Sequence, residues 1–404
     1  MTENETQSHY RVISFLIIIL SMVALTSLLS FVEKLGLDLW ICNYVIDLLF
    51  FLAIVFEMEF ERKRAKIAQN IETTFLRIAT GFGICSIFAA AMFFLPHFVR
   101  PVLLFPIIMY GVCNTVISIS TSMYFIYMLC LLSSSNIYEF GLYVLLVVVG
   151  LAWVRALEET QYHLEVCILL SLIGLLLPVL FCYFDSHTLE LQRLLYSAIN
   201  SVLVFVLSFF LFHRLRNGTI EEVQNRLTDI LADSYSEVIE LRLYSKSEYL
   251  HAIMVSKICF ECAKKLGLKA DLCAAAGFYY RIGKWKGEPH VENGVFYAKK
   301  LCFPTELIQI IAEYYGEKEP ISTKEAALVH IVDATVKKLQ VLQSQAAASG
   351  WNKELLIYQT LNDFSQSGIY DRSGLSMNQF LQIREMLVKE EKINELLSGD
   401  GVSD

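Results

Sequence analysis

The stretch ADLCAAAGFYYRIGK, residues 270–284, indicates the fold of the second half of this chain. Its apolar residues recur at intervals of three and four, which is the spacing of one face of an α-helix. Gly267, Gly283 and Gly316 are expected to end helices. The same helical spacing recurs in the segments 249–267, 293–302, 304–316 and 323–340. No strand-like alternation competes with this pattern, so the sequence predicts a compact all-α domain.

The first half of the chain has the composition of a membrane protein. The 404 residues have a mean hydropathy of +0.50, and only ten of the 33 Lys and Arg precede residue 214. Seven apolar runs are close to the ~20 residues that cross a bilayer as a helix. They are roughly 12–32, 39–56, 75–96, 102–132, 137–154, 164–184 and 194–212. These runs predict a multi-span domain at 1–213, embedded in the lipid bilayer of a cell membrane.

The fourth run, 102–132, is too long for one simple span, and Pro101, Pro106 and Asn114 would allow a kink, a re-entrant piece or a second short helix. How this run folds decides whether two basic segments of the chain lie on the same side of the membrane. The basic segment FERKRAK (60–66) and the basic residues at 214 and 216 both favour the cytoplasm. Five spans between these two segments would place them on opposite sides of the membrane, whereas an even number of spans between them would place them on the same side. Seven spans are expected, with the C-terminal domain cytoplasmic.

The segment after the last run, 219–243, predicts one amphipathic connecting helix of about six turns, interrupted at Ser234. This helix either transmits rotation or dimerisation to the domain that follows, or it simply packs on its own domain. The expected organisation is therefore a membrane domain at 1–213, a connecting helix at 214–247, a helical domain at 248–345 and a helical extension at 346–404.

Polar groups are sparse within the apolar runs. Asn43 and Asp47 lie four residues apart on one helix face. Asp47 is either a proton or cation site or, more simply, a group that hydrogen-bonds a neighbouring helix. Because a conduction pathway needs several such groups, a transporter or purely structural membrane protein is only an alternative.

The soluble half resembles a known family in the order and spacing of its motifs. GFYYRIGK (277–284) is similar to the YYHDIGK motif of the HD-domain metal-dependent phosphohydrolases, with Tyr280 and Arg281 in place of its His-Asp pair. The resemblance is greatest to membrane-anchored seven-span members that hydrolyse cyclic di-AMP, and it covers about residues 217–390. It implies an all-helical, cytoplasmic HD-type domain and, in that family, a site for Mn or Fe.

The family's ligand positions can be followed along this sequence. His251 falls on the first ligand His, and Asp333 on the terminal Asp. The closing His pair falls on Tyr314 and Tyr315. His290 either matches a further ligand position or coincides with it by chance, because only five residues separate it from Lys284. His251 is either a remnant pocket residue or a core histidine.

The departures from the family pattern weaken the metal site. Tyr is a poor neutral ligand, and Arg281 stands where a bridging carboxylate is required. A guanidinium about 4 Å from a dication would cost roughly 8 kcal/mol at an effective dielectric of about 20. We expect Asp333 to pair with Arg281 instead, and no cofactor to be bound. Tyr280, Arg281, Lys284 and Tyr314 would then rim a cationic, aromatic pocket suited to a phosphate-bearing ligand.

The sequence thus predicts a membrane-anchored signalling or regulatory protein with a catalytically degenerate HD domain, which binds a nucleotide, such as a cyclic dinucleotide, or a partner. A homodimer is one option for that partner. An active metal-dependent phosphohydrolase with an altered site is the main alternative. Nucleic-acid binding is not expected, because the net charge is −8 and no basic stripe is present.

Overall fold

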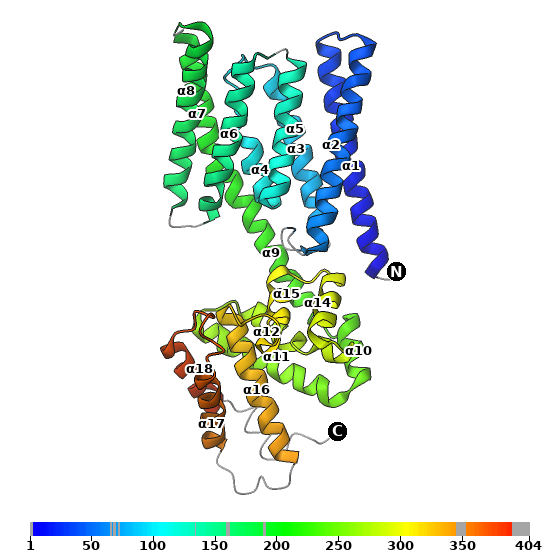
Figure 1. The fold of residues 1–404 in the computed structure, drawn as a ribbon, viewed down its shortest axis with the longest axis vertical. Helices are drawn as coiled ribbons and strands as arrows, with labels where there is room; N and C mark the ends of the chain where they lie inside the picture. The colour runs from blue at the N-terminus through cyan, green and yellow to red at the C-terminus, as the bar shows by residue number, and fades with distance from the viewer. Residues whose placement is uncertain are drawn as a thin grey trace. The chain divides into compact units, whose positions relative to one another are not determined.

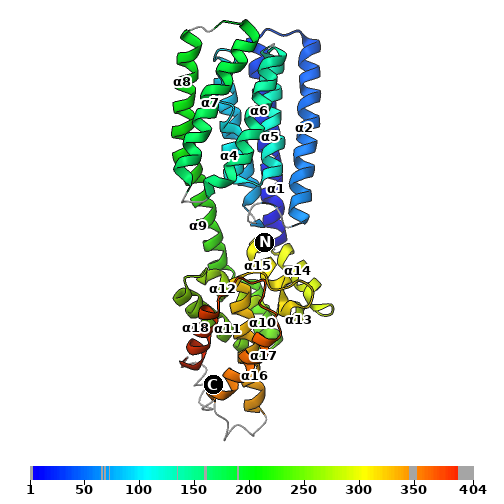
Figure 2. The same ribbon diagram turned by 60° about the vertical axis from the view of Figure 1, so that its left-hand side comes forward.

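The structure, a computed structural model, describes residues 3–64, 67, 70–71, 73–133, 135–158, 162–188, 191–344 and 353–389. Among these residues every regular element is a helix, which confirms the all-α prediction. The chain divides into two compact units, residues 1–221 and 222–404. Figures 1 and 2 show the helices of both units in two views.

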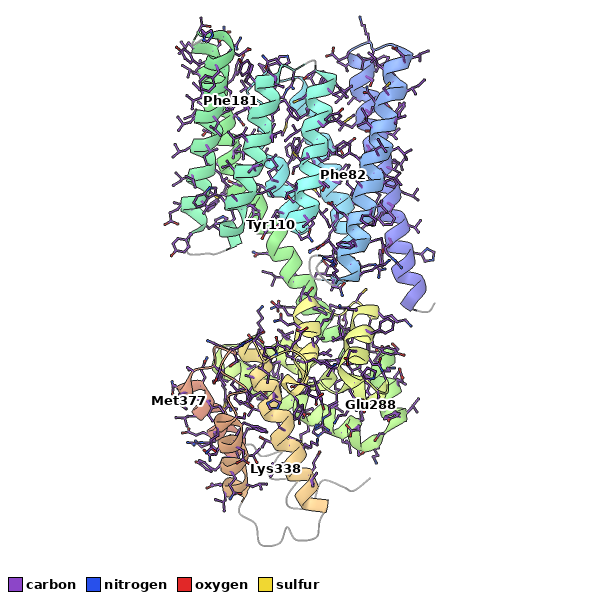
Figure 3. All side chains as sticks on the ribbon, in the orientation of Figure 1. Phe82, Tyr110, Phe181, Glu288, Lys338 and Met377 are labelled. Carbon is purple, nitrogen blue, oxygen red and sulfur yellow. The ribbon has the colours of Figure 1, made fainter. Side chains whose placement is uncertain are left out.

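Seven described helices of the first unit are long and apolar enough to cross a bilayer, as the hydropathy predicts. They are α1 (Glu3–Val32), α2 (Leu37–Lys63), α3 (Thr74–Phe93), α5 (Thr115–Leu132), α6 (Ile137–Val154), α7 (His163–Ser186) and α8 (Leu191–Leu207), whose spanning stretch continues to Phe210. Figure 3 shows side chains that project outward from the flanks of this bundle. Leu49 on α2 and Val202 on α8 are 61% and 63% exposed. A lipid environment accounts for this apolar outer surface, so the chain is a membrane protein.

The fourth apolar run forms two helices. The first, α4 (Leu104–Val112), is buried along its whole length, and with nine residues it is too short to cross a bilayer alone. Pro106 lies in its first turn, where proline is tolerated. The chain then turns at Asn114, whose side-chain oxygen accepts a hydrogen bond from the Ile117 N–H (3.0 Å) and caps α5.

This additional helix changes the direction of the chain. Because α4 turns back into the bundle before α5 crosses it, the N-terminus, the end of α2 and the start of α9 (His213–Asp229) lie at one end of the first unit (Figures 1 and 2). The basic residues Arg62, Lys63 and Arg64 at the end of α2 therefore lie at the same end as Arg214. The two basic segments, which five simple spans would separate, share one side.

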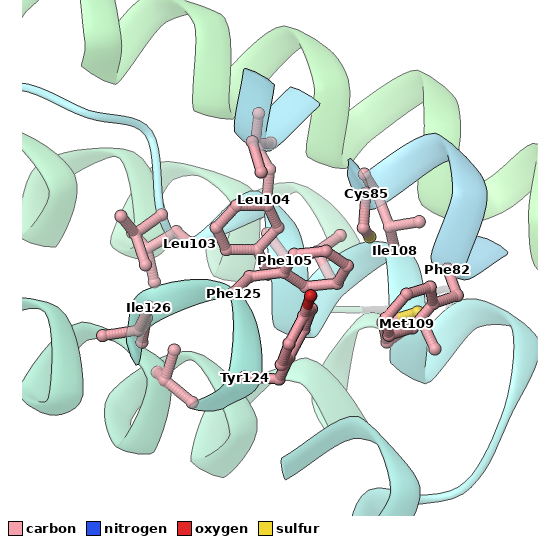
Figure 4. Close-up of a cluster of buried hydrophobic side chains, with 14 of the residues drawn as sticks. Phe82, Cys85, Leu103, Leu104, Phe105, Ile108, Met109, Tyr124, Phe125 and Ile126 are labelled. Carbon is pink, nitrogen blue, oxygen red and sulfur yellow. The ribbon is translucent and has the colours of Figure 1, made fainter. Parts of the chain in front are cut away.

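Aromatic packing fills the centre of this bundle (Figure 4). Phe125 of α5 lies between Phe105 of α4 and Phe82 of α3, with ring centroids 4.9 and 4.8 Å away. Tyr124 stacks on the same Phe82 ring at 5.6 Å. All four side chains are fully buried, so α4 is held by contacts that each contribute beyond their area.

The second unit is a cluster of shorter helices. After α9 come α10 (Ser236–Tyr244), α11 (Lys246–Leu266), α12 (Ala270–Tyr279), α13 (Ile282–Trp285), α14 (His290–Lys300), α15 (Thr305–Ala312), the 3₁₀ turn η4 (Tyr314–Gly316), α16 (Lys324–Ser344), α17 (Lys353–Gln366) and α18 (Met377–Lys389). The helices α11, α12 and α16 pack on one another at its centre. The segments within 249–340 that have helical spacing thus form helices, apart from the turns between them.

The connecting segment is not the single six-turn helix that its amphipathic pattern predicts. It forms α9 and α10, separated by turns at 230–235. Tyr279 of α12 donates a hydrogen bond of 2.5 Å to the backbone carbonyl of Ile230, the first residue after α9. Thus α9 ends before the expected interruption at Ser234, and a tertiary contact satisfies a carbonyl at its end.

Gly283 was expected to end a helix and instead lies inside the short helix α13. Its role is a close approach, because a Cβ atom there would lie 1.8 Å from the carbonyl oxygen of His290. Gly294 faces it from α14, where a Cβ atom would lie 3.2 Å from the backbone nitrogen of Gly283. Gly267 does end α11, in the left-handed conformation with φ +68°.

Candidate functional site

Four elements of the second unit bring the candidate residues together. Asp333 lies on α16 and His251 on α11, while Arg281 lies at the junction of α12 and α13. Small residues precede that junction and allow α12 to lie against α11. A Cβ atom at Gly277 would come within 3.1 Å of the backbone of Ser256 on α11. This close packing carries Arg281 to the Asp333 carboxylate.

The Asp333 carboxylate accepts four hydrogen bonds. Its Oδ1 atom lies 2.8 Å from Nε of Arg281 and 2.8 Å from Nε2 of His251. Its Oδ2 atom lies 3.1 Å from the Nη2 atom of Arg281 and 2.9 Å from the hydroxyl of Tyr315. A carboxylate offers about four lone-pair positions, so Asp333 is saturated by protein donors. The expected pairing of Asp333 with Arg281 is confirmed.

These contacts determine the charge of the group. Burial by itself would raise the pKa of Asp333, but the hydrogen bond from His251 and the charge of Arg281 lower this pKa to about 2. Burial opposes the charge of Arg281 as well, yet the nearby Asp333 carboxylate raises its pKa above the usual value. Glu248 adds a second carboxylate 3.5 Å from Nη1 of Arg281. The pair is therefore ionised at neutral pH.

Three tyrosines form the wall beside this ion pair. The Tyr280 ring lies 4.9 Å from the Tyr314 ring and 6.0 Å from the Tyr315 ring. Tyr280 also accepts a hydrogen bond of 3.0 Å from the backbone N–H of Tyr315. Tyr315 adopts a left-handed backbone with φ +52°, which is unusual for an aromatic residue and directs its hydroxyl to Asp333. The family resemblance places its closing pair on Tyr314 and Tyr315, and of these two residues Tyr315 makes the contact with Asp333.

A narrow cleft opens next to the tyrosines. Its lining residues are Tyr280, Arg281, Gly283, Lys284, His290, Val291, Ile311 and Tyr314. Only about 10 Å³ of the cleft is open to the centre of a water molecule, which is room for one water. The ammonium group of Lys284 lies 5.8 Å from the centre of the Tyr314 ring. Burial and the neighbouring charges of Arg281 and Lys337 lower the pKa of Lys284.

The predicted site residues thus form two neighbouring groups. Tyr280, Arg281, Lys284, Tyr314 and His290 line the cleft, while His251 and Asp333 meet at the ion pair. His290 begins α14, and its Nε2 atom lies 2.8 Å from Glu288 in the preceding loop. The structure records no contact between His290 and either His251 or Asp333.

The residues at this position do not fit a transition metal. Of the three ligand candidates only His251 and Asp333 are in contact, and they are in contact with each other. His251 also lies 2.8 Å from Oε1 of Gln340 through its other ring nitrogen. Within the described parts of the chain no three His, Cys, Asp or Glu side chains are arranged to hold a metal ion. The guanidinium of Arg281 occupies the space beside the carboxylate that a metal would need.

Two residues that the sequence analysis did not place at the site also contact it, the buried His330 and the half-buried Gln340. His330 is 1% exposed. Its ring stands edge-on to Tyr315 with centroids 4.6 Å apart, and its Nδ1 atom lies 2.7 Å from the hydroxyl of Tyr370. Gln340 lies seven residues after Asp333 on the same face of α16. That spacing was the available indication that Gln340 faces the site.

No family model matches this chain. Ribonuclease Y of Finegoldia magna is 34% identical over 95 residues, which are 22% of this chain and 18% of that protein. Ribonuclease Y of Thermotoga petrophila is 25% identical over 159 residues, or 38% of this chain and 30% of that protein. The HD domain of the L. monocytogenes phosphodiesterase PgpH shares 18% identity, with a TM-score of 0.34 over 40% of this chain and 99% of that domain. It has also been solved with cyclic-di-AMP, and that form shares 17% identity and the same TM-score.

The chain is therefore similar to HD-domain proteins, and seven of its described helices could cross a membrane. The expected resemblance is therefore confirmed. The chain spans less than a third of the length of these two ribonuclease Y relatives. Similarity to phosphodiesterases and ribonucleases does not by itself transfer their activity, because function depends on the residues of the site. In the HD-like unit those residues form an ion pair.

Proposed function

We propose that this chain is a membrane-anchored regulatory protein whose HD-like unit binds no catalytic metal and does not hydrolyse phosphoesters. The observation that supports this most directly is the saturation of Asp333 by Arg281, His251 and Tyr315. Metal-assisted hydrolysis needs a divalent ion that acidifies water and holds a phosphoryl oxygen. In this unit the charge that would balance the carboxylate belongs to the protein itself.

We further propose that the HD-like unit is cytoplasmic. The end of the membrane unit that holds the N-terminus and α9 carries Arg11, Arg62, Lys63, Arg64, Arg77 and Arg214. The opposite end carries Lys34, Arg100 and Arg193. This excess favours the cytoplasm for the first end, from which α9 leads toward the second unit.

A second candidate function is the binding of a phosphate-bearing ligand, such as a nucleotide, at the cleft. It is favoured by the surplus of positive charge, because Lys284, Arg281 and Lys337 lie beside two carboxylates, the buried Asp333 and the more exposed Glu248. An anion next to Lys284 would offset this surplus. The space for one water is far below the roughly 300–1,000 Å³ typical of ligand pockets, so such binding requires Tyr314 and Lys284 to move outward.

Metal content and hydrolysis of the full-length protein, reconstituted in nanodiscs, test the main proposal against an active phosphohydrolase that uses Mn or Fe. The protein is produced with both metals supplied, and elemental mass spectrometry measures the ions per chain. Hydrolysis of bis(p-nitrophenyl) phosphate, cyclic di-AMP and a short RNA is then measured with added Mn²⁺. An Asp333→Asn variant is the matched control, because it removes the carboxylate and keeps the side-chain shape.

We expect far less than one ion per chain, and rates that do not differ between the wild-type chain and Asp333→Asn. Stoichiometric metal and hydrolysis that are both lost in Asp333→Asn would overturn the proposal. For the second candidate, cyclic di-AMP binding is compared between the wild-type chain and Lys284→Met. Binding that is weakened by Lys284→Met would support a nucleotide sensor, whereas no binding would leave regulation through a partner protein. The homodimer considered above stays a prediction.

A further inference from the structure

A second polar site lies in the core of the membrane unit, far along the chain from the HD-like unit. Asp47 is on α2 and is 1% exposed. Its Oδ1 atom accepts a hydrogen bond of 3.0 Å from the hydroxyl of Tyr124 on α5. The interhelical hydrogen bond expected for Asp47 is therefore present. It accounts for only one of the two carboxylate oxygens.

The other oxygen, Oδ2, is buried and has no hydrogen-bond partner. The hydroxyl oxygens of Thr26 and Ser30 on α1 are also buried and also have none. Ser27 of α1 and Tyr44 of α2 are linked by a hydrogen bond of 3.0 Å, which sets the register of this antiparallel helix pair. Thr26 therefore lies level with Asp47, and its hydroxyl interacts with the carboxylate without the geometry of a hydrogen bond. Two oxygen atoms without a hydrogen-bond partner, Oδ2 of Asp47 and the hydroxyl oxygen of Thr26, therefore lie close together.

Glu139, another buried carboxylate among the described residues of this bundle, has different surroundings. Glu139 of α6 lies 3.6 Å from the guanidinium of Arg100 and 2.7 Å from Nδ1 of His97. It also accepts hydrogen bonds from the backbone N–H of Phe98 and the hydroxyl of Tyr143. Glu139 therefore has both a cation and a full set of donors. Asp47 forms no ion pair with any described residue, although it lies in the same low-dielectric interior.

The surroundings of Asp47 are rigid. The Tyr124 ring packs edge-on against Phe50 at 5.4 Å and stacks on Phe82 at 5.6 Å, so its hydroxyl has a fixed direction. Figure 4 shows Tyr124 within this cluster of apolar side chains. The titratable group that faces Asp47 from α5 is Tyr124, and α1 contributes only hydroxyl groups at this level. On α2 itself the next acid toward the C-terminal end is Glu57, ten residues further on. No long basic side chain of the described residues reaches the carboxylate.

We propose that Asp47 is a binding site for one monovalent cation, H⁺ or Na⁺, held by its Oδ2 atom with the Thr26 hydroxyl beside it. The oxygen atoms of the site indicate which ion it binds. Carboxylate and hydroxyl oxygens prefer hard cations, and together these groups carry one negative charge. A divalent ion would leave a net positive charge inside the bilayer, and a larger ligand would not fit in a fully buried position. An ionisable group inside a membrane bundle is a candidate functional site by default, and here an unused oxygen supports that assignment.

The test measures the thermal unfolding of the full-length protein in nanodiscs. The Na⁺ concentration is varied at constant ionic strength with choline as the replacement cation, and the series is repeated from about pH 5 to about pH 8. The wild-type chain is compared with Asp47→Asn and with Asp38→Asn, which removes an exposed acid from the same helix. Binding to the folded chain alone raises the unfolding temperature with ligand concentration.

If Na⁺ is the ligand, the unfolding temperature of the wild-type chain and of Asp38→Asn rises with Na⁺, whereas that of Asp47→Asn does not. Thr26→Val, which keeps the charge, then weakens the apparent Na⁺ affinity by roughly tenfold. If the proton is the ligand, the temperature rises as the pH falls, without regard to Na⁺, and Asp47→Asn alone loses this rise. Equal responses of the wild-type chain and Asp47→Asn to both Na⁺ and pH would refute the site. Should Asp47→Asn fail to fold, absence of any Na⁺ or pH response in the wild-type chain and in Thr26→Val would refute it equally.

Discussion

Replacing Arg281 by methionine tests the ion pair that distinguishes the HD-like unit. Methionine keeps most of the length of the side chain but removes the charge and both hydrogen bonds to Asp333. Hydrogen bonds to a charged group contribute about 1.5–3 kcal/mol each, and breaking a buried ion pair costs about 3–5 kcal/mol. Because His251 and Tyr315 still donate to Asp333, the lower end is expected. The predicted loss of unfolding free energy is about 3 kcal/mol.

Hydrogen exchange followed by mass spectrometry measures this loss in the full-length protein in nanodiscs. Amides of α16 that exchange only when the unit opens should exchange about 150-fold faster, because each 1.36 kcal/mol is a factor of about ten. Lys269→Met is the matched control, because Lys269 pairs with Glu306 at the exposed surface of the same unit. An exposed pair contributes little, so this variant should behave like the wild-type chain.

A double-mutant cycle isolates the pair itself. Arg281→Met, Asp333→Asn and the double variant are compared, and the double variant should cost less than the sum of the two single changes by about 2 kcal/mol. If Arg281→Met accelerates exchange no more than Lys269→Met does, Asp333 is not held by Arg281. Internal neutralisation of Asp333 would then no longer support the proposal that the HD-like unit binds no catalytic metal.

Three further predictions concern the same unit. Burial lowers the pKa of His330 from 6.5 to about 4, so between these pH values the unfolded chain binds a proton that the folded chain does not. The second unit should therefore lose about 3 kcal/mol of unfolding free energy as the pH falls from 6.5 to about 4. The His330→Asn variant should not show this loss. Tyr315→Phe removes one donor to Asp333 and should cost about 1.5–3 kcal/mol, whereas Tyr314→Phe, which removes no such contact, should cost little. Gly283→Ala should destabilise the junction of α13 and α14 by at least about 2 kcal/mol, because its Cβ atom would overlap the carbonyl of the first residue of α14. Hydrogen exchange of the second unit measures all three.

Each of these predictions has a contrary outcome. If the unfolding free energy depends on pH equally in the wild-type chain and in His330→Asn between pH 6.5 and about 4, groups other than His330 cause the loss of stability in acid. The Asp333 carboxylate, with a pKa of about 2 against 3.8 when unfolded, contributes stability that is lost only as the pH falls below about 3.8, so the two windows can be separated. Equal effects of Tyr315→Phe and Tyr314→Phe would contradict the hydrogen bond to Asp333. Unchanged exchange in Gly283→Ala would show that α13 and α14 can separate at little cost.

The sequence alone determined the class of each half of the chain. Membrane spans depend on the summed hydropathy of about 20 neighbouring residues, and helices depend on apolar spacing within one or two turns. Both properties are local, so seven spanning helices and the helical segments of the second unit were predictable. The pairing of Arg281 with Asp333 was predictable as well, because family resemblance supplied the contact between residues 52 positions apart.

The tertiary structure decided what depends on non-local contacts. The carbonyl of Ile230 at the end of α9 binds Tyr279, a partner that lies outside residues 219–243. Tyr315, rather than Tyr314, reaches Asp333 because its backbone is left-handed at that point. The unused oxygen of Asp47 follows from which groups α1 and α5 place around it. In each case the deciding partner lies on another helix, so its position is set by the packing of the whole unit.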